Sequence, residues 1–426
     1  MNTQHAIETI NFWLINSRDP ILYHWDIIND IPVKTNEIID IIGPRRCGKS
    51  SILKLIIKKL KLKDNYLFLN FEDPFFIENN TPRDIEDLIN IFIEHFNPNL
   101  KYLFFDEIQQ INDWERIIRK YRDLNKFKIF VTGSSSKLLS SELSTLLTGR
   151  HLTQKVFPLS FTEYLNFNNV HVKSRKALAL KMPTIKKFLN KFLNAGGFPE
   201  AVLTNNPELL KTYFFDILYK DVVMRYDIRQ KNVLEKIALF MISNSAKTYS
   251  INSLKKTFNI SFELASSYLS YLKEAFLIFE IQQFSFSLKA QNKALGKIYS
   301  VDTGLASAVS FKFSDEKGRM LENVIFLELK KTSSQKLFYY KTKSNYEVDF
   351  LTFINEKPDL LIQVAYSIDD LKTRHREIRT LKAAMKELNL KKSYIITMES
   401  EEECLQVDGY EIEIIPAPLW ILNRSF

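Results

Sequence analysis

Eight consecutive residues have the composition of a phosphate-binding loop. They fit the pattern G-x-x-x-x-G-K-[ST], follow a short apolar run and precede a helical pattern, which is the context that gives the pattern meaning. In order they are Gly43, Pro44, Arg45, Arg46, Cys47, Gly48, Lys49 and Ser50. Amides that point inward at a helix N-terminus bind phosphate oxygens. We expect these residues and Ser51 to bind a nucleotide, with Lys49 at the β- and γ-phosphates and the Ser50 hydroxyl on Mg²⁺.

Two adjacent carboxylates follow a second apolar run. Tyr102–Phe105 is followed by Asp106 and Glu107, and an acid at the C-terminal end of a strand lies beside the phosphate loop in sheets of this kind. We expect Asp106 to hold Mg²⁺ through its water shell and Glu107 to polarise the attacking water. The alternative is a strand that ends in two solvated acids.

Hydroxyl side chains and an arginine extend the candidate site. A later strand pattern ends at Thr132 and Ser134, and either side chain could contact the γ-phosphate or the attacking water, unless the segment is a plain turn. Arg150 is a candidate for stabilising charge in the transition state. The sequence leaves open whether it acts in its own chain, in a neighbouring copy or only on the surface. Arg225 and Arg229 are weaker candidates of the same kind.

Alternating strand and helix patterns over the first 160 residues must position these groups. Buried strands that alternate with helices predict a parallel sheet covered on both faces. The strand-like runs are Glu37–Ile42, Tyr66–Phe71, Tyr102–Phe105 and Lys128–Val131, and the helical patterns are Ser51–Leu62 and Arg83–Phe96.

The pattern changes beyond residue 160. Residues 161–226 are mostly helical, with a break at Gly196-Gly197-Phe198-Pro199. Three short helical patterns over residues 233–275 and a β-like run at Phe279–Phe286 have the outline of a winged helix. From about Leu321 one helix precedes several strand-like runs, a charged helix and a late strand.

Composition excludes several classes of protein. The chain has 426 residues, 45% hydrophobic and 26% charged, as in a folded globular protein. No apolar run approaches the ~20 residues of a membrane span, and the N-terminus lacks the pattern of a secretory signal, so we expect no membrane association. Two cysteines provide neither a disulfide framework nor an all-thiolate zinc site, which favours a cytoplasmic location. The net charge of +9 permits a polyanionic partner.

The motifs together resemble those of one family. GPRRCGKS, LFFDEIQ, VTGSSSKLLSSE, TGRH with FPLSFTEYL, GGFPEAVL and YKDVVMRYDI closely resemble, in content and order, the archaeal and bacterial P-loop ATPases of the AAA+ type with a C-terminal DUF4143 region. The resemblance covers residues 37 to 365 and implies an α/β fold. Its parts are an ASCE/AAA+-like P-loop NTPase parallel-sheet core (residues 1–160), a helical lid (161–230), a winged helix (231–310) and a restriction-endonuclease-like domain (311–426).

The resemblance also implies details of the nucleotide site. An extra strand should lie between the phosphate loop and Asp106. Gly196, Gly197 and Pro199 should form a turn of the lid near the nucleotide, although a helix break without ligand contact is the alternative. The nucleotide should be ATP rather than GTP.

The winged-helix segment is a weak candidate for DNA binding through its third helix. Ser261–Glu274 contains one lysine and two glutamates, whereas phosphate contacts supply most non-specific affinity. Flanking lysines could contact the DNA backbone instead, namely Lys255, Lys256, Lys289 and Lys293. The alternative is a protein-docking or purely structural module.

The C-terminal third resembles the PD-(D/E)xK nuclease fold but lacks part of its chemistry. Glu322, on a helical pattern, and Asp349, on a strand pattern, are placed as the acids of the nuclease motif would be. The positions of its E-x-K element are instead occupied by Gln363-Val364-Ala365. Gln is a weaker metal ligand, and Ala cannot stabilise charge, so we predict no nuclease activity. A basic stretch could still bind nucleic acid or could be a solvated charged helix: Lys372, Arg374, His375, Arg376, Arg379 and Lys382.

The sequence therefore predicts an Mg²⁺-dependent ATP-binding and ATP-hydrolysing protein. Its nucleotide state would move the lid and winged helix and act on DNA or a protein partner, with a homo-oligomer as a candidate assembly. Two alternatives are a nucleotide-controlled signalling switch that hydrolyses slowly and a DNA-processing protein of a mobile element or defence system.

Overall fold

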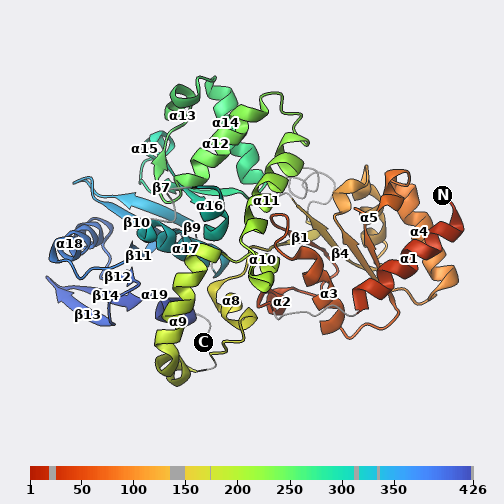
Figure 1. Cartoon of the computed structure of the whole chain (residues 1–426), viewed down its shortest axis with the longest axis horizontal. Coiled ribbons are helices and arrows are strands. Elements are labelled where there is room, and N and C mark those ends of the chain that lie inside the picture. Colours follow the sequence, from red (N-terminus) through yellow and green to blue (C-terminus); the bar gives the residue numbers. More distant parts are fainter. Residues whose placement is uncertain (19–24, 135–148, 173, 311–315, 333–335, 424–426) are drawn as a thin grey trace. The chain divides into compact units, whose positions relative to one another are not determined.

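A computed structural model (Figure 1) describes residues 1–18, 25–134, 149–172, 174–310, 316–332 and 336–423. These residues fall into two units. Unit 1 comprises Met1–Phe157 with Glu274–Phe276, and unit 2 comprises Pro158–Lys273 with Leu277–Phe426. The first boundary lies close to the expected one at residue 160. The further division into lid, winged helix and C-terminal domain stays a prediction.

Five parallel strands form the sheet of unit 1, in the order β2-β3-β4-β1-β5. They are β1 (Ile38–Ile42), β2 (Tyr66–Asn70), β3 (Tyr102–Asp106), β4 (Lys128–Gly133) and β5 (His151–Lys155). The first four are almost entirely buried and apolar, as expected of parallel strands covered on both faces. The predicted parallel sheet is confirmed, and β4 lies between β1 and β3 as the resemblance implied.

The helical patterns predicted at Ser51–Leu62 and Arg83–Phe96 are helices in the structure, and the described part of unit 1 has five α-helices in all. They are α1 (Thr3–Arg18), α2 (Ile27–Asp30), α3 (Lys49–Lys59), α4 (Pro82–His95) and α5 (Trp114–Asp123). Helix α4 begins with a capping box, in which Thr81 and Asp84 each satisfy a backbone amide of the other. Helix α3 begins directly at Lys49, so the phosphate-loop pattern occupies the whole β1–α3 connection.

Unit 2 begins with helices, as predicted. They are α8 (Phe161–Phe167), α9 (Arg175–Ala195), α10 (Pro199–Thr204) and α11 (Glu208–Asp216), after which a π-helix covers Ile217–Val223. The Gly196-Gly197-Phe198-Pro199 break lies between α9 and α10.

Residues 231–300, most of the segment expected to be a winged helix, contain four helices and three antiparallel strands. The order is α12 (Lys231–Ser243), β6 (Thr248–Tyr249), α13 (Ile251–Phe258), α14 (Phe262–Glu274), β7 (Ile278–Gln283) and β8 (Gly296–Ser300), with the short helix α15 (Leu288–Lys293) between β7 and β8. The winged-helix interpretation stays a prediction.

A single nine-stranded sheet runs through unit 2, in the order β13-β14-β12-β11-β10-β9-β7-β8-β6. Its other strands are β9 (Lys336–Lys341), β10 (Glu347–Ile354), β11 (Lys357–Ala365), β12 (Lys392–Thr397), β13 (Glu403–Val407) and β14 (Tyr410–Pro416). The helices of this part are α16 (Thr303–Val309), α17 (Lys317–Thr332), α18 (Leu371–Leu388) and α19 (Ala417–Asn423). Because β7 pairs with β9, the segments expected as two separate domains share one sheet.

Among the residues described, no helix is long and apolar enough to cross a membrane.

Candidate nucleotide-binding site

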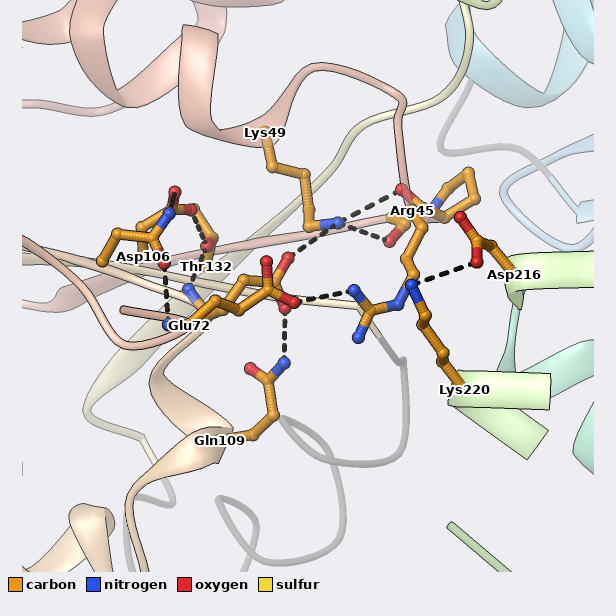
Figure 2. Close-up of polar contacts among 12 residues, drawn as sticks. Arg45, Lys49, Glu72, Asp106, Gln109, Thr132, Asp216 and Lys220 are labelled. Carbon is orange, nitrogen blue, oxygen red and sulfur yellow. Dashed lines mark hydrogen bonds and ion pairs between the residues drawn. The ribbon is translucent and has the colours of Figure 1, made fainter. Parts of the chain in front are cut away.

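Lys49 points into the loop that precedes it (Figure 2). Its side chain is 4% exposed, and Nζ donates to the carbonyl oxygens of Gly43 at 3.2 Å and Pro44 at 3.1 Å. The same Nζ lies 3.4 Å from Oε1 of Glu107. The ammonium is therefore held at the centre of the loop, where it can exchange these oxygens for phosphate oxygens.

Close packing leaves no room for side chains at the two loop glycines. A Cβ on Gly43 would lie 2.1 Å from the Val156 carbonyl oxygen, and one on Gly48 would lie 2.6 Å from the Trp25 ring. Gly48 also has a φ of 98°, which other residues rarely adopt. Because Gly48 caps α3 without a side-chain acceptor, the first amides of the helix are available to an anion.

The remaining loop residues divide into buried and surface positions. Cys47 is buried, with Sγ 3.7 Å from the Val156 carbonyl oxygen, and burial raises the pKa of its thiol to about 11. Arg45 pairs with Glu72 at 2.8 Å, and Arg46 is exposed with a φ of 65°. Ser50 and Ser51 lie half-buried in the first turn of α3.

The acid pair lies at the same sheet edge as the loop. Asp106 ends β3, and its Oδ1 accepts from the Thr132 hydroxyl at 2.6 Å, while Oδ2 accepts from Asn70 Nδ2 at 3.2 Å. The Thr132 hydroxyl also accepts from the Glu107 amide at 2.9 Å. Thr132 is fully buried, so its observed role is to orient the two acids.

Glu107 adopts a left-handed backbone conformation, with φ 53° and ψ 48°. This conformation is uncommon for a residue other than glycine and costs of order 1 kcal/mol or more. It sends the Glu107 carboxylate toward Lys49 while Asp106 remains in the strand. Gln109 Nε2 donates to Oε2 of Glu107 and fixes the second oxygen.

The two carboxyls have opposite pKa shifts. Burial, reinforced by the neighbouring charge of Glu107, raises the pKa of Asp106 to about 6, although Thr132, Ser50 and Lys49 oppose that rise. Burial also disfavours ionisation of Glu107, but Lys49, Gln109 and Arg45 outweigh it and hold the pKa of Glu107 below its ordinary value. The hydrogen bond from Ser50 brings its hydroxyl and the Asp106 carboxylate together, which is the donor set expected for Mg²⁺.

Two of the other predicted residues, Ser134 and Arg150, lie at opposite edges of the sheet. Ser134 is buried just beyond the C-terminal end of β4, at the edge of the sheet that carries the loop. Arg150 precedes β5, and its carbonyl oxygen accepts from the amide of Ile38 at the start of β1. It therefore lies at the opposite edge of the parallel sheet, where its guanidinium pairs with Asp123 at 3.0 Å. The length of β1 separates Arg150 from the phosphate loop, which does not favour a role on the nucleotide of its own chain, and its catalytic role stays a prediction. The motif residues 135–142 lie outside the described part of the chain.

Gly196, Gly197 and Pro199 belong to unit 2, and their contacts there are structural. The Gly197 amide donates to Oδ2 of Asp302 at 2.6 Å, and its carbonyl accepts from Leu159. A Cβ on Gly196, whose φ is 69°, would lie 2.0 Å from Oδ1 of Asp302. Pro199 is the first residue of α10. The close packing of this turn explains the glycines without a ligand, and a contact with nucleotide stays a prediction.

Sequence reasoning missed four residues of the site. Asn70 and Gln109 hold Asp106 and Glu107, Glu72 holds Arg45, and Trp25 packs against Gly48. Asn70 could have been found, because it ends β2 at the same sheet edge as Asp106 ends β3. The other three lie outside the strand ends and carry no such signal.

A buried lysine lies among the acids that were expected to mark a nuclease-like site in unit 2. Lys297 on β8 has a side chain 2% exposed, and Nζ lies 2.7 Å from Glu322, 3.0 Å from Glu347 and 2.8 Å from Asp349. Despite burial, these carboxylates raise the pKa of Lys297 well above its ordinary value. Within the described residues no group of three or more His, Cys, Asp or Glu side chains could hold a metal. The absence of nuclease activity stays a prediction.

Internal pairs neutralise half of the basic stretch on α18. Arg374 pairs with Glu403 at 2.6 Å, Arg376 with Glu377 at 2.5 Å, and Lys382 with Asp408. The carboxylates that neutralise this helix come partly from β13 and the β13–β14 turn, which the sequence did not indicate. A nucleic-acid role for this helix therefore has fewer free cations than its composition suggests.

Three family models match successive parts of the chain. An AAA domain matches residues 35–165, a domain of unknown function (DUF8612) matches 186–316, and a domain of unknown function (DUF4143) matches 317–420. An uncharacterized protein of Methanocaldococcus jannaschii is 40% identical over 429 residues, covering 93% of this chain and 91% of that protein. An uncharacterized protein of Haemophilus influenzae is 28% identical over 410 residues, and the match covers 92% of this chain and 96% of that protein.

Two solved structures resemble parts of this chain, both with low TM-scores. C. elegans PCH-2 has a TM-score of 0.30 at 15% identity, covering 49% of this chain and 61% of that one. AMPPCP-bound DnaA from Aquifex aeolicus has a TM-score of 0.25 at 13% identity, and the match covers 64% of this chain and 88% of the DnaA chain.

Proposed function

The chain belongs to the family of AAA+-type P-loop proteins with a C-terminal DUF4143 region, and from that premise we propose that it binds and hydrolyses ATP with Mg²⁺. The observation that carries the proposal is the position of Lys49. Its ammonium lies inside the phosphate loop within 3.4 Å of Glu107, while Asp106 and Ser50 are hydrogen-bonded beside it. An ammonium, a hydroxyl and two carboxylates thus lie at one sheet edge, and this supports the proposed roles of cation, metal ligands and base.

The residues present fit a nucleotide and its metal. Lys49 and the α3 amides would bind phosphate oxygens, and Ser50 and Asp106 would hold Mg²⁺, which neutralises charge on the transferred phosphoryl group. When Lys49 turns to the phosphates, its ion pair with Glu107 weakens. Glu107 is then free to accept a hydrogen bond from the attacking water and orient it.

Nucleotide binding can be tested by thermal unfolding. With ATP and Mg²⁺ at ~1,000 times the dissociation constant, the folded state should gain about 4 kcal/mol, so the melting temperature of the wild type should rise. Lys49→Ala should lose this rise, because the ammonium that binds the phosphates is gone. Lys58→Ala, which removes an exposed lysine from the same helix, is the matched control and should keep it. An equal rise for wild type and Lys49→Ala would contradict the proposal.

Hydrolysis is tested separately. Glu107→Gln removes the carboxylate that would orient water but keeps the shape of the side chain and the hydrogen-bonding capacity toward Lys49. We expect ATP-dependent stabilisation to persist while turnover, measured as phosphate release, falls by about 10²-fold or more. Turnover at the wild-type rate in this variant would show that another group activates the water.

One observation favours a nucleotide-controlled switch as the second candidate. Glu107 is held by Lys49 and Gln109, so its carboxylate must leave the ion pair with Lys49 before it can orient water. A single-turnover assay with and without DNA separates the two candidates. Rapid hydrolysis stimulated by DNA supports a remodelling ATPase, and one slow turnover supports the switch.

The finer parts of the proposal concern what the cycle acts on. We propose that ATP binding changes the position of the helices of unit 2 and of the winged-helix segment, with DNA or a protein as partner. Plasmid incubated with Mg²⁺ or Mn²⁺ should stay intact. Cleavage would instead favour the DNA-processing protein of a mobile element or defence system.

A further inference from the structure

Both ends of the connection between β7 and β8 are hydrogen-bonded to the same residue, Tyr339 of β9. The amide of Phe284 donates to the carbonyl oxygen of Tyr339 at 2.8 Å, and the Tyr339 hydroxyl donates to the carbonyl oxygen of Leu295 at 2.7 Å. Tyr339 is fully buried on β9. Both ends of the segment from Phe284 to Leu295, here called the wing, are therefore anchored to the same strand.

An aromatic ring protrudes from this anchored base. Phe286 is 78% exposed, which is unusual for so large an apolar side chain in a folded protein. Its neighbour Phe284 packs on Phe353 at a ring distance of 4.7 Å and on Phe338 at 5.8 Å. Phe284 also contacts Phe286 edge to face at 4.9 Å. The buried rings support the exposed one and limit its freedom, so it loses little entropy when it binds a ligand.

The wing carries positive charge only. It contains Lys289 and Lys293 and no acidic residue. Both lysines are exposed, and because they are four residues apart on α15 they lie on the same face of that helix. Gln291 donates to Gln282 of β7 at 3.3 Å, which ties α15 back to the sheet.

We propose that the wing patch, defined as Phe286, Lys289 and Lys293, binds single-stranded nucleic acid. A single strand offers a flat base and a phosphate in every repeat, which match an exposed ring beside two cations. Stacking on an aromatic ring tolerates any base, and lysines that track the backbone make such binding general. A duplex keeps its bases stacked inside, and an acidic protein lacks regularly spaced π faces. The proposal goes beyond the nucleotide cycle and does not depend on ATP hydrolysis.

The test uses the full-length protein, without nucleotide, and a fluorescein-labelled oligothymidylate followed by fluorescence anisotropy. Phe286→Ala should weaken binding by about 5- to 150-fold, the effect of losing one stacked base, and Phe286→Tyr should restore it. Lys289→Ala with Lys293→Ala should lower the slope of log affinity against log salt by about 1.4, since each lost phosphate contact contributes about 0.7. Because all three side chains are exposed, circular dichroism should show every variant folded.

Matched controls locate the effect. Phe262→Ala removes an exposed ring of α14, and Lys211→Ala with Lys231→Ala removes two exposed lysines elsewhere in unit 2. Both should bind as the wild type does. Lys49→Ala should also bind the strand normally, so the outcome does not depend on whether the ATPase proposal succeeds.

Three results would overturn the inference. One is wild-type affinity in Phe286→Ala. Another is a duplex of the same length that binds as tightly as the single strand. The third is polyglutamate that competes with the strand in a manner that depends on Phe286, which would point to an acidic protein partner.

Discussion

His151 and Asp40 form a polar contact between two strands of the sheet of unit 1. Asp40 lies fully buried on β1, and its carboxylate is hydrogen-bonded to His151 Nδ1 at 2.9 Å and to the Thr153 hydroxyl at 2.6 Å on β5. The hydrogen bond to Asp40, which outweighs the opposing effect of burial, raises the pKa of His151 above its ordinary value. A protonated His151 thus ties the edge strand β5 to the strand that carries the phosphate loop.

This contact predicts a pH-dependent stability. A raised pKa in the folded state gives stability that is fully present below the ordinary histidine pKa of about 6.5 and is lost as pH rises through the folded value. His151→Gln should therefore lower the melting temperature most at about pH 5.5 and least at about pH 9. A constant difference for His151→Gln at both pH values would count against a protonated contact.

At the scale of elements, Lys297 joins three parts of unit 2. It lies on β8, whereas Glu322 lies on α17 and Glu347 and Asp349 lie on β10. The Tyr299 hydroxyl also donates to Glu322 at 2.8 Å. Lys297 compensates the negative charge of these acids. It therefore links β8, which belongs to the segment expected to be a winged helix, to α17 and β10 of the segment that follows.

Removing Lys297 should weaken the contacts among β8, α17 and β10. Lys297→Met leaves buried carboxylates without their cation, a change that costs about 3 to 5 kcal/mol in comparable buried pairs. Amide hydrogen exchange should accelerate in β8, β10 and α17. Lys336→Met breaks an ion pair with Glu356 that is 61% and 76% exposed and should have almost no effect. Unchanged exchange in Lys297→Met would mean that packing alone holds these elements together.

At the scale of the whole molecule, Arg150 raises the question of assembly. It lies at the sheet edge opposite the phosphate loop, paired with Asp123, which does not favour a role on the nucleotide of its own chain. If it acts in hydrolysis, we expect it to do so on a neighbouring copy. We therefore keep the trans role and the homo-oligomer together as one prediction.

Mixing two inactive variants tests that prediction. Arg150→Ala retains Glu107, and Glu107→Gln retains Arg150, so an assembly that contains both should form some complete sites and recover ATP hydrolysis. Asp123→Ala, which loses the ion pair but keeps the arginine, should hydrolyse ATP alone. Hydrolysis by Arg150→Ala at the wild-type rate would show that this arginine has only a structural role.

The sequence by itself determined the local features of this protein. A glycine-rich loop between an apolar strand and a helix, and acids at the end of a strand, are set by residues close together in the chain, so the loop, Asp106 and Glu107 could be located without coordinates. The parallel sheet followed from the alternation of buried strands and helices.

Only the tertiary structure decided contacts between distant segments. It separated Arg150 from the loop by the length of a strand, gave Gly196 and Gly197 a packing partner in Asp302, and placed Lys297 among acids up to 52 residues away. Such contacts depend on strand order and register, and the periodicity of one segment carries no information about which distant strand will pair with it. Within each unit, therefore, sequence identified which groups could do chemistry, and packing determined which of them meet.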